Sequence, residues 1–188
     1  GSASQISGGI LSMNAEGVIS AAAGSSLSIS SAISGNSGLT ISGGGTVSLS
    51  GNNTFSGGLT LNGGTLSFSS DSNLGDAGNS INLGGGILKP TSSLAGTSRN
   101  ISVIGRGDID LDAGQTFTVS GNISSPTNAT ISGALIKSGD GTLVLTGTNT
   151  YTGGTTVIGG TLSVSSAASL AQGSPNGFAP ITLDGGTL

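Results

Sequence analysis

The chain contains one stretch of sequence twice, and this internal repeat constrains its fold more than any other feature. Residues 43–74 and residues 139–170 match at 18 of 32 positions without a gap, at an offset of 96. A segment that recurs at a long fixed offset indicates a structural unit that stacks against its own copies. We therefore expect residues 1–188 to form one repetitive segment of two imperfect units, at about 10–90 and about 100–188.

Weaker similarities extend the repeat on both sides of this core. They pair residues 23–30 with 113–120 at an offset of 90, and residues 81–86 with 181–186 at an offset of 100. Each change in offset indicates a loop of different length in the two units. These loops are expected near residues 125–130 and 173–177, where Pro126 and Pro175 do not interrupt a strand ladder.

Composition excludes several classes of protein. Only 6% of the 188 residues are charged, 34% are hydrophobic and the net charge is −4, whereas disorder favours low hydrophobicity and high net charge. The chain has no cysteine, so it has no disulfide, thiolate metal site or cysteine nucleophile. With four basic residues and a pI near 4.1, no nucleic-acid partner is expected, because phosphate binding needs clustered lysine and arginine.

Short apolar runs alternate with serine and threonine between glycine-rich breaks. The period of two, as in residues 47–49 and 66–68, is that of a half-buried strand. No helix is predicted. The predicted strands, each of about four residues, are 10–13, 18–21, 27–30, 39–42, 47–50, 59–62, 66–69, 81–83, 87–89, 101–104, 108–111, 117–120, 135–138, 143–146, 155–158, 162–165 and 181–184.

Short strands, glycine-rich turns and long-range repetition together predict an all-β fold. The predicted architecture is a right-handed single-stranded parallel β-helix (β-solenoid), a fragment of a longer rod, with coils of roughly 20 residues. The inward side chains are expected to include Leu49, Leu61, Leu66, Phe68, Leu145, Val157, Leu162 and Val164. An antiparallel β-sandwich is the alternative, but its hairpins favour two-residue Asn-Gly or Asp-Gly turns between longer strands.

Two further expectations concern the corners of the coils. Glycine pairs are expected to adopt positive φ there, at residues 57–58, 63–64, 153–154 and 159–160. Asn53 and Asn149 occupy equivalent positions and are expected to stack as amide ladders.

The second copy resembles a known repeat. Residues 137–162, KSGDGTLVLTGTNTYTGGTTVIGGTL, are similar to the autotransporter-associated β-strand repeat of bacterial passenger regions. The first copy is similar but looser, with Phe55, Leu59 and Asn62 where the second has Tyr151, Thr155 and Ile158. The residues that carry the motif are Gly141, Thr142, Leu143, Leu145, Gly147, Asn149, Thr150, Tyr151, Gly153, Gly154, Gly160, Thr161 and Leu162.

The resemblance implies a cell-surface or secreted passenger of a Gram-negative bacterium. Its partners would be the rest of the same passenger chain and a C-terminal outer-membrane barrel through which it is exported by the type V route. The implied role is a structural stalk that assists passenger folding and export and displays a distal functional region. The alternative is an adhesin module whose loops along the rod bind a host surface or like chains. Gly1 and Ser2 are expected to be a cloning remnant on a fragment of a longer protein.

Two short motifs suggest ligands. Asp108, Asp110 and Asp112 alternate, so they would project from one face of a strand and could hold Ca²⁺ through carboxylate oxygens. An outward acidic row with Ile109 and Leu111 inward is the simpler interpretation. Arg106-Gly107-Asp108 is an integrin-type tripeptide, expected in a turn before a strand; solvated charges around a turn glycine explain it equally well.

Two other activities known on β-solenoids fit the sequence poorly. Some polysaccharide lyases and hydrolases use this fold, but the chain has no histidine and its other acids are scattered. We therefore predict no enzyme, no cofactor and no small-molecule substrate. Threonines at 146, 148, 150 and 152 resemble the arrays of ice-binding solenoids, but Gly147 and Asn149 predict a turn within that run.

Overall fold

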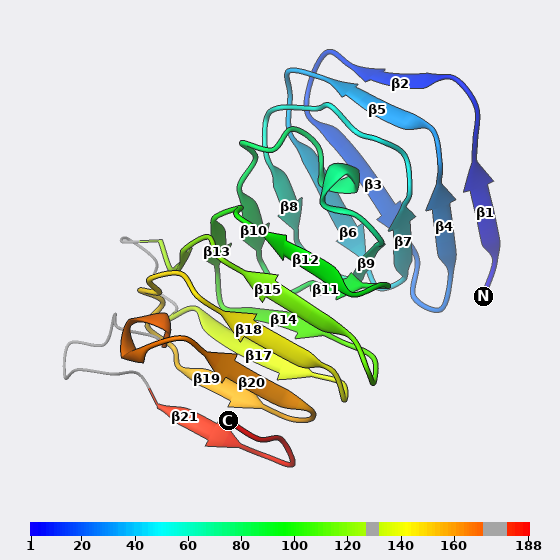
Figure 1. Ribbon diagram of the computed structural model, residues 1–188. Coiled ribbons are helices and arrows are strands. Elements are labelled where there is room, and N and C mark those ends of the chain that lie inside the picture. The colour runs from blue at the N-terminus through cyan, green and yellow to red at the C-terminus, as the bar shows by residue number, and fades with distance from the viewer. Residues whose placement is uncertain (127–131, 171–179) are drawn as a thin grey trace.

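The chain folds into a parallel β-solenoid of about eight turns (Figure 1). The computed structural model describes residues 1–126, 132–170 and 180–188. Across these residues the helical structure is limited to two short 3₁₀ helices, η1 (Asp71–Leu74) and η2 (Ala167–Ser169). None of the helices in the described ranges is long and apolar enough to cross a membrane.

Each coil has three positions for a strand, which we call faces 1, 2 and 3 in chain order. Face 1 is a nine-stranded sheet that runs the length of the rod. All of its pairs are parallel. Its strands are β1 (Ala3–Ile6), β4 (Ser26–Ile29), β7 (Thr46–Leu49), β9 (Thr65–Phe68), β11 (Ile87–Pro90), β14 (Arg106–Asp110), β17 (Ala134–Ser138), β19 (Thr155–Val157) and β21 (Ile181–Leu183).

Face 2 follows face 1 in each coil and is interrupted. It consists of a two-stranded sheet, β2 (Ile10–Met13) and β5 (Ala32–Gly35), and a four-stranded sheet, β12 (Leu94–Thr97), β15 (Thr116–Val119), β18 (Thr142–Leu145) and β20 (Thr161–Val164). Face 3 is a six-stranded sheet, β3 (Gly17–Ala21), β6 (Leu39–Gly43), β8 (Leu59–Leu61), β10 (Ile81–Leu83), β13 (Ile101–Val103) and β16 (Ile123–Ser124).

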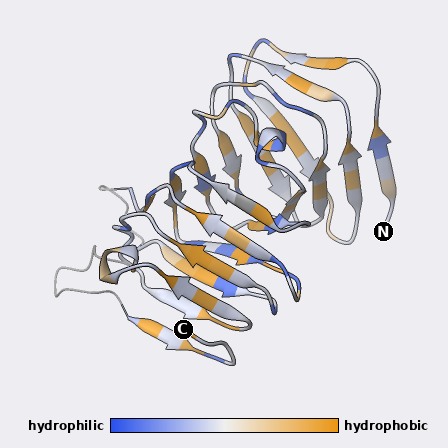
Figure 2. Cartoon of the chain, viewed as in Figure 1, coloured by the Kyte–Doolittle hydropathy of each residue, from blue (hydrophilic) through white to orange (hydrophobic). Residues whose placement is uncertain are grey.

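Strand pairing aligns like residues from coil to coil, which confirms the predicted alternation. On face 1, Val47 pairs with Leu66 and Leu49 with Phe68, and all four are buried. Apolar positions alternate with polar ones along the strands (Figure 2). Seven of the eight predicted inward side chains are buried, and Val164 packs against the core while partly exposed.

The two sequence copies occupy different faces of the rod. In the first copy β7 and β9 lie on face 1 and β8 lies on face 3. Their counterparts 96 residues later, β18, β20 and β19, lie on faces 2, 2 and 1. The repeat therefore spans a whole number of turns plus one face, and the second copy is rotated forward by one face about the rod axis.

Glycine pairs form corners as predicted, and the two glycines of each pair differ in conformation in the same way. The second glycine has positive φ in all four: Gly58 at 91°, Gly64 at 66°, Gly154 at 84° and Gly160 at 62°. Side chains with a Cβ are strained in this conformation. The prediction missed β1, β5, β12, β16 and both 3₁₀ helices, because these segments lack a clear apolar alternation or are very short.

Candidate functional site: the coil-bridging repeat and the charged coils

The most elaborate contacts of the first copy surround Asn53, in the extended segment after β7. Its side chain is buried, while its neighbours Asn52 and Thr54 are exposed. The Asn53 Oδ1 accepts a hydrogen bond from the Ile33 N–H at 2.8 Å, and its Nδ2 donates to the Asn73 carbonyl at 2.5 Å. Ile33 belongs to the preceding coil and Asn73 to the following one, so one side chain joins three coils.

Asn149 makes the same contacts in the second copy. Its Oδ1 accepts from the Ile123 N–H at 2.8 Å and its Nδ2 donates to the Ser169 carbonyl at 2.5 Å. The backbone N–H of Asn149 donates to the Ala168 carbonyl at 2.9 Å. The expected amide ladder is therefore wrong: both asparagines bond backbone groups of adjacent coils, because these buried groups would otherwise lack partners.

Asn73 adds a second bridge in the first copy. Its Oδ1 accepts from the N–H groups of Ser69 and Ser70 at 3.1 and 2.8 Å, which caps helix η1, and its Nδ2 donates to the Gly51 carbonyl at 2.9 Å. Ser169 stands at the equivalent position and bonds the Ser165 hydroxyl at 3.0 Å instead. The first copy is thus the more extensively bridged of the two.

An aromatic residue follows each bridging asparagine by two positions and points into the core. Phe55 and Tyr151 are both fully buried. The Tyr151 hydroxyl lies 2.5 Å from the Thr155 Oγ1, and burial raises the pKa of the tyrosine. In the first copy Phe55 and Leu59 stand at these positions, so two buried apolar side chains replace the buried hydrogen bond of the second copy.

The other residues of the repeat motif serve packing and turning. Gly141, Leu143, Leu145, Gly147 and Leu162 are buried, as is Gly154. Thr142, Gly153, Gly160 and Thr161 are half-buried, and Thr150 is exposed. The motif brings no group of reactive side chains together on the surface.

The acidic row lies on face 1 as the alternation predicts, with Ile109 and Leu111 buried. Lys89 of the preceding coil donates to Asp110 at 2.6 Å and to Asp112 at 2.8 Å, and these hydrogen bonds raise its pKa. Asp108 accepts from the Ser138 hydroxyl at 2.7 Å in the following coil, and burial raises the pKa of this carboxyl. Among the described residues no group of three acidic, histidine or cysteine side chains is arranged to hold a metal ion.

The integrin-type tripeptide does not lie in a turn, contrary to the prediction. Arg106, Gly107 and Asp108 begin strand β14, which is paired with β11 on one side and β17 on the other. A Cβ on Gly107 would lie 2.8 Å from the Leu83 Cβ, so this position faces the core and admits only glycine without a shift.

The threonine run at 146–152 also differs from its prediction. Thr146, Thr148 and Thr150 are exposed, while Gly147, Asn149 and Tyr151 between them are buried. Gly147 and Asn149 therefore mark an extended segment rather than a turn. Exposed and buried residues therefore continue to alternate through this segment, where the Asn149 Oδ1 accepts a hydrogen bond from the Ile123 N–H.

Sequence reasoning missed two buried cations. Arg99 is 2% exposed, and its guanidinium donates to the Asp71 carboxylate at 2.9 Å and to the backbone carbonyls of Asp71, Gly75, Asp76 and Asn79. These bonds hold residues 71–79 against the rod. Arginine suits this position because its planar fork presents five donors.

Lys137 occupies an inward position on β17, between Ile109 and Val157, where the first copy has Ile41. Its ammonium donates to the carbonyls of Ser138, Gly139 and Gly159 at 2.6, 2.7 and 3.2 Å. Burial lowers the pKa of Lys137. The Ile41-to-Lys137 difference between the copies is the one sequence feature that could have revealed this buried charge.

These observations define a class of protein: a repeat-built parallel β-solenoid whose repeated side chains join coil to coil. The model of the passenger-associated-transport-repeat family matches residues 39–68 and 135–164. The adhesin BmaC autotransporter of Brucella suis biovar 1 (strain 1330) is 38% identical over 96 residues, a match that covers 51% of this chain and 3% of that protein. No solved structure matches the chain.

Two segments of the chain are therefore passenger-associated transport repeats, and half of the chain is similar to part of an autotransporter adhesin. Both matches begin two strands before the bridging asparagine, at β6 and β17, and include the bridging asparagine and the buried aromatic. A passenger of this type is exposed at the cell surface or secreted across the outer membrane.

Proposed function

We propose that this segment is a non-enzymatic structural stalk that assists folding and export of its passenger and displays a more distal region. The observation that carries the proposal is the placement of the repeated side chains. Asn53 and Asn149 each bond the coils on either side, and the motif puts no chemistry on the surface. A repeat conserved between copies in this way serves stacking.

Coil stacking gives a physical route to assisted export. In a solenoid each coil contacts its neighbours, so a folded coil presents a template on which the next can form. A chain that leaves a barrel in extended form would fold coil by coil, and each added coil would oppose backward movement. Inward side chains of the size of leucine contribute about 1.5–3 kcal/mol each when buried.

An adhesin module is the second candidate, and the name of the Brucella relative favours it. In this alternative the loops at 125–130 and 173–177 bind a host surface or like chains. Residues 127–131 and 171–179 lie outside the described part of the chain. The contacts between coils therefore support the stalk directly, whereas the adhesin module is supported by the name of the relative alone.

Deletion of one whole coil in the full-length passenger tests the stalk. Ser26 pairs with Thr46, so removal of residues 26–45 places β7 on β1 in the same alignment. Leu11, which pairs with Ile33, would then present its N–H to Asn53. We expect normal surface display and normal activity of the distal region, measured by flow cytometry with a distal epitope.

The matched control removes residues 26–35, which is half a coil, so that β6 of face 3 takes the place of β4 on face 1. This variant should lose surface display. Equal display of the two deletions would contradict the stalk. Normal display of the whole-coil deletion with loss of cell binding would instead favour the adhesin module.

A further inference from the structure

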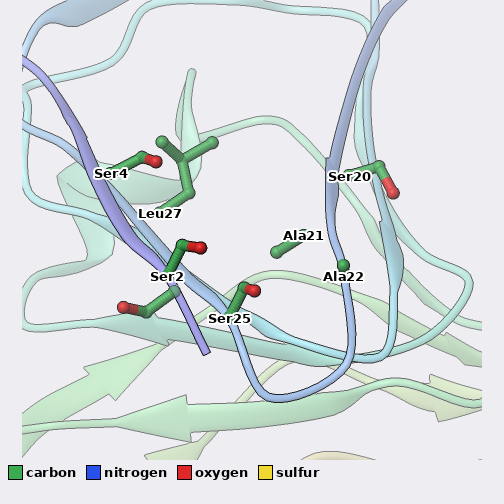
Figure 3. A pocket seen from close by; sticks show the side chains of 8 residues that line it. Ser2, Ser4, Ser20, Ala21, Ala22, Ser25 and Leu27 are labelled. Carbon is green, nitrogen blue, oxygen red and sulfur yellow. The ribbon is translucent and has the colours of Figure 1, made fainter.

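A cavity of about 260 Å³ lies at the first coil, and none of the residues that line it is charged (Figure 3). Serine and alanine residues and Leu27 form its lining, so it offers a ligand no ionic contact. The loop of residues 71–79, which we call the acceptor loop, differs from this cavity. Five of its oxygen atoms converge on one buried charged group, the guanidinium of Arg99.

The guanidinium of Arg99 is bound through all of its N–H groups. Its Nε donates to the Asp71 carboxylate at 2.9 Å. Its Nη1 donates to the carbonyls of Asp76 and Asn79 at 2.5 and 3.4 Å, and its Nη2 donates to those of Asp71 and Gly75 at 3.0 and 2.9 Å. A guanidinium has five N–H donors in a fixed plane. The acceptor loop therefore matches this group in the number of its acceptors.

Hydrogen bonds that do not involve Arg99 hold the acceptor loop in place. The N–H of Asp76 and the side-chain amide of Asn79 both donate to the Phe55 carbonyl of the preceding coil, at 2.9 and 2.8 Å. The Asn73 side chain caps η1 within the loop and also bonds the preceding coil. The positions of the acceptors are therefore set largely by contacts with the preceding coil.

Charge and burial favour a guanidinium at this position. Asp71 and Asp76 are the charged residues of the acceptor loop, which contains no lysine or arginine. The Arg99 side chain is buried, so its removal would leave buried acceptors without donors, which is destabilising. An ammonium group has only three donors and lacks the planar fork, so it would satisfy fewer of the five acceptors.

We propose that residues 71–79 form a binding site for a monoalkyl guanidinium group, and that Arg99 is the ligand that this chain supplies to it. The site goes beyond the proposed stalk function and does not depend on it. When the Arg99 side chain is absent, an alkyl guanidinium from solution occupies the same place.

Chemical rescue of Arg99→Ala tests the site. The atoms that this variant lacks correspond to ethylguanidinium, which is the probe. At low millimolar concentration we expect ethylguanidinium to raise the Tm of Arg99→Ala and to slow amide exchange at residues 71–79 toward that of the unmodified protein. Ethylammonium, which has the charge without the fork, should do neither. Arg106→Ala, which removes an exposed arginine, should not respond to ethylguanidinium.

A second pair of variants tests the contact with the carboxylate. Asp71→Asn in the Arg99→Ala background should raise the ethylguanidinium concentration at half-maximal rescue by about tenfold, because it weakens a hydrogen bond between charged groups. The matched control is Asp76→Asn in the same background. It removes the same charge from the loop, but the Asp76 carboxylate bonds the Gly78 N–H, so the half-maximal concentration should change much less.

If Arg99→Ala does not fold alone, the same comparison is made by refolding it with each compound. Recovery of folded protein with ethylguanidinium and not with ethylammonium would support the site. An equal response to the two compounds, or no response to either, would overturn the proposal.

Discussion

Asn53 and Asn149 make the same pair of side-chain hydrogen bonds to the coils before and after them, yet they lie on different faces of the rod. Asn53 follows β7 and takes the face 2 position, whereas Asn149 follows β18 and takes the face 3 position. The contact geometry therefore belongs to the repeat itself and does not depend on the face that carries it.

Loss of either bridging amide should destabilise the rod. Asn149→Ala leaves the Ile123 N–H and the Ser169 carbonyl without their partner, and an unsatisfied buried polar group costs about 1–3 kcal/mol. We expect a similar loss in the free energy of unfolding for Asn53→Ala, measured by urea titration. Asn52→Ala, at the exposed neighbouring position, is the control and should be neutral. Equal effects of Asn52→Ala and Asn53→Ala would contradict the bridge.

The buried Tyr151–Thr155 pair should behave as a unit. Tyr151→Phe alone removes one partner and leaves the Thr155 hydroxyl buried without it, at a cost of about 1–3 kcal/mol. The double variant Tyr151→Phe/Thr155→Leu recreates the Phe55–Leu59 arrangement of the first copy and should recover most of the loss. A double-mutant cycle in urea would show strong coupling. Simple additivity of the two single changes would argue against the contact.

Lys137 should make stability increase with pH on the alkaline side. Because burial lowers its pKa below the ordinary 10.5, the unfolded chain binds more protons than the folded one between the two values. The free energy of unfolding, relative to that of Lys137→Met, should rise with pH through this window and level off above 10.5. A pH-independent difference between the two proteins would contradict the burial.

Lys89 should make stability decrease as pH rises, in a pH range above that of Lys137. Its hydrogen bonds to Asp110 and Asp112 raise its pKa above 10.5, so its stabilising contribution is complete below 10.5 and disappears as pH rises through the folded value. The matched variant is Lys89→Met, compared with the unmodified protein by urea titration between pH 9 and pH 12. A contribution that grows above 10.5 would contradict the ion pair.

Arg99 should control the order of residues 71–79. Arg99→Ala removes five hydrogen bonds to this segment. We therefore expect a lower free energy of unfolding and faster amide exchange at residues 71–79. Hydrogen exchange with mass spectrometry gives the local measurement. Arg106→Ala, at an exposed arginine, should leave exchange there unchanged. Unaltered exchange in Arg99→Ala would show that residues 71–79 stay ordered without the Arg99 hydrogen bonds.

The fold could be predicted from the sequence because the alternation of Val47, Leu49, Leu66 and Phe68 reports the core directly. The bridging role of Asn53 could not, because its bonds go to backbone atoms of residues 20 positions away. The burial of two charged side chains could not be predicted for a similar reason. Arg99 and Lys137 are held by carbonyl groups whose positions depend on the coil geometry, and no local pattern encodes them.

The rotation of the second copy about the rod axis could not be predicted from the sequence either. An offset of 96 fixes how much sequence separates the copies, but the face on which each lands depends on the length of every intervening coil. Those lengths vary, since Thr46 pairs with Thr65 while Arg106 pairs with Ala134. Similar segments therefore occupy different faces without any change in their own sequence.

We propose that alternate residues of the repeat build a stacked core that the passenger needs for display. The most direct measurement compares Leu145→Asp with Thr146→Asp in the full-length passenger. Leu145 is fully buried and Thr146 is exposed, and a buried unpaired charge is strongly destabilising. We expect loss of the distal epitope from the cell surface for Leu145→Asp and normal display for Thr146→Asp. Normal surface display of both variants would contradict it.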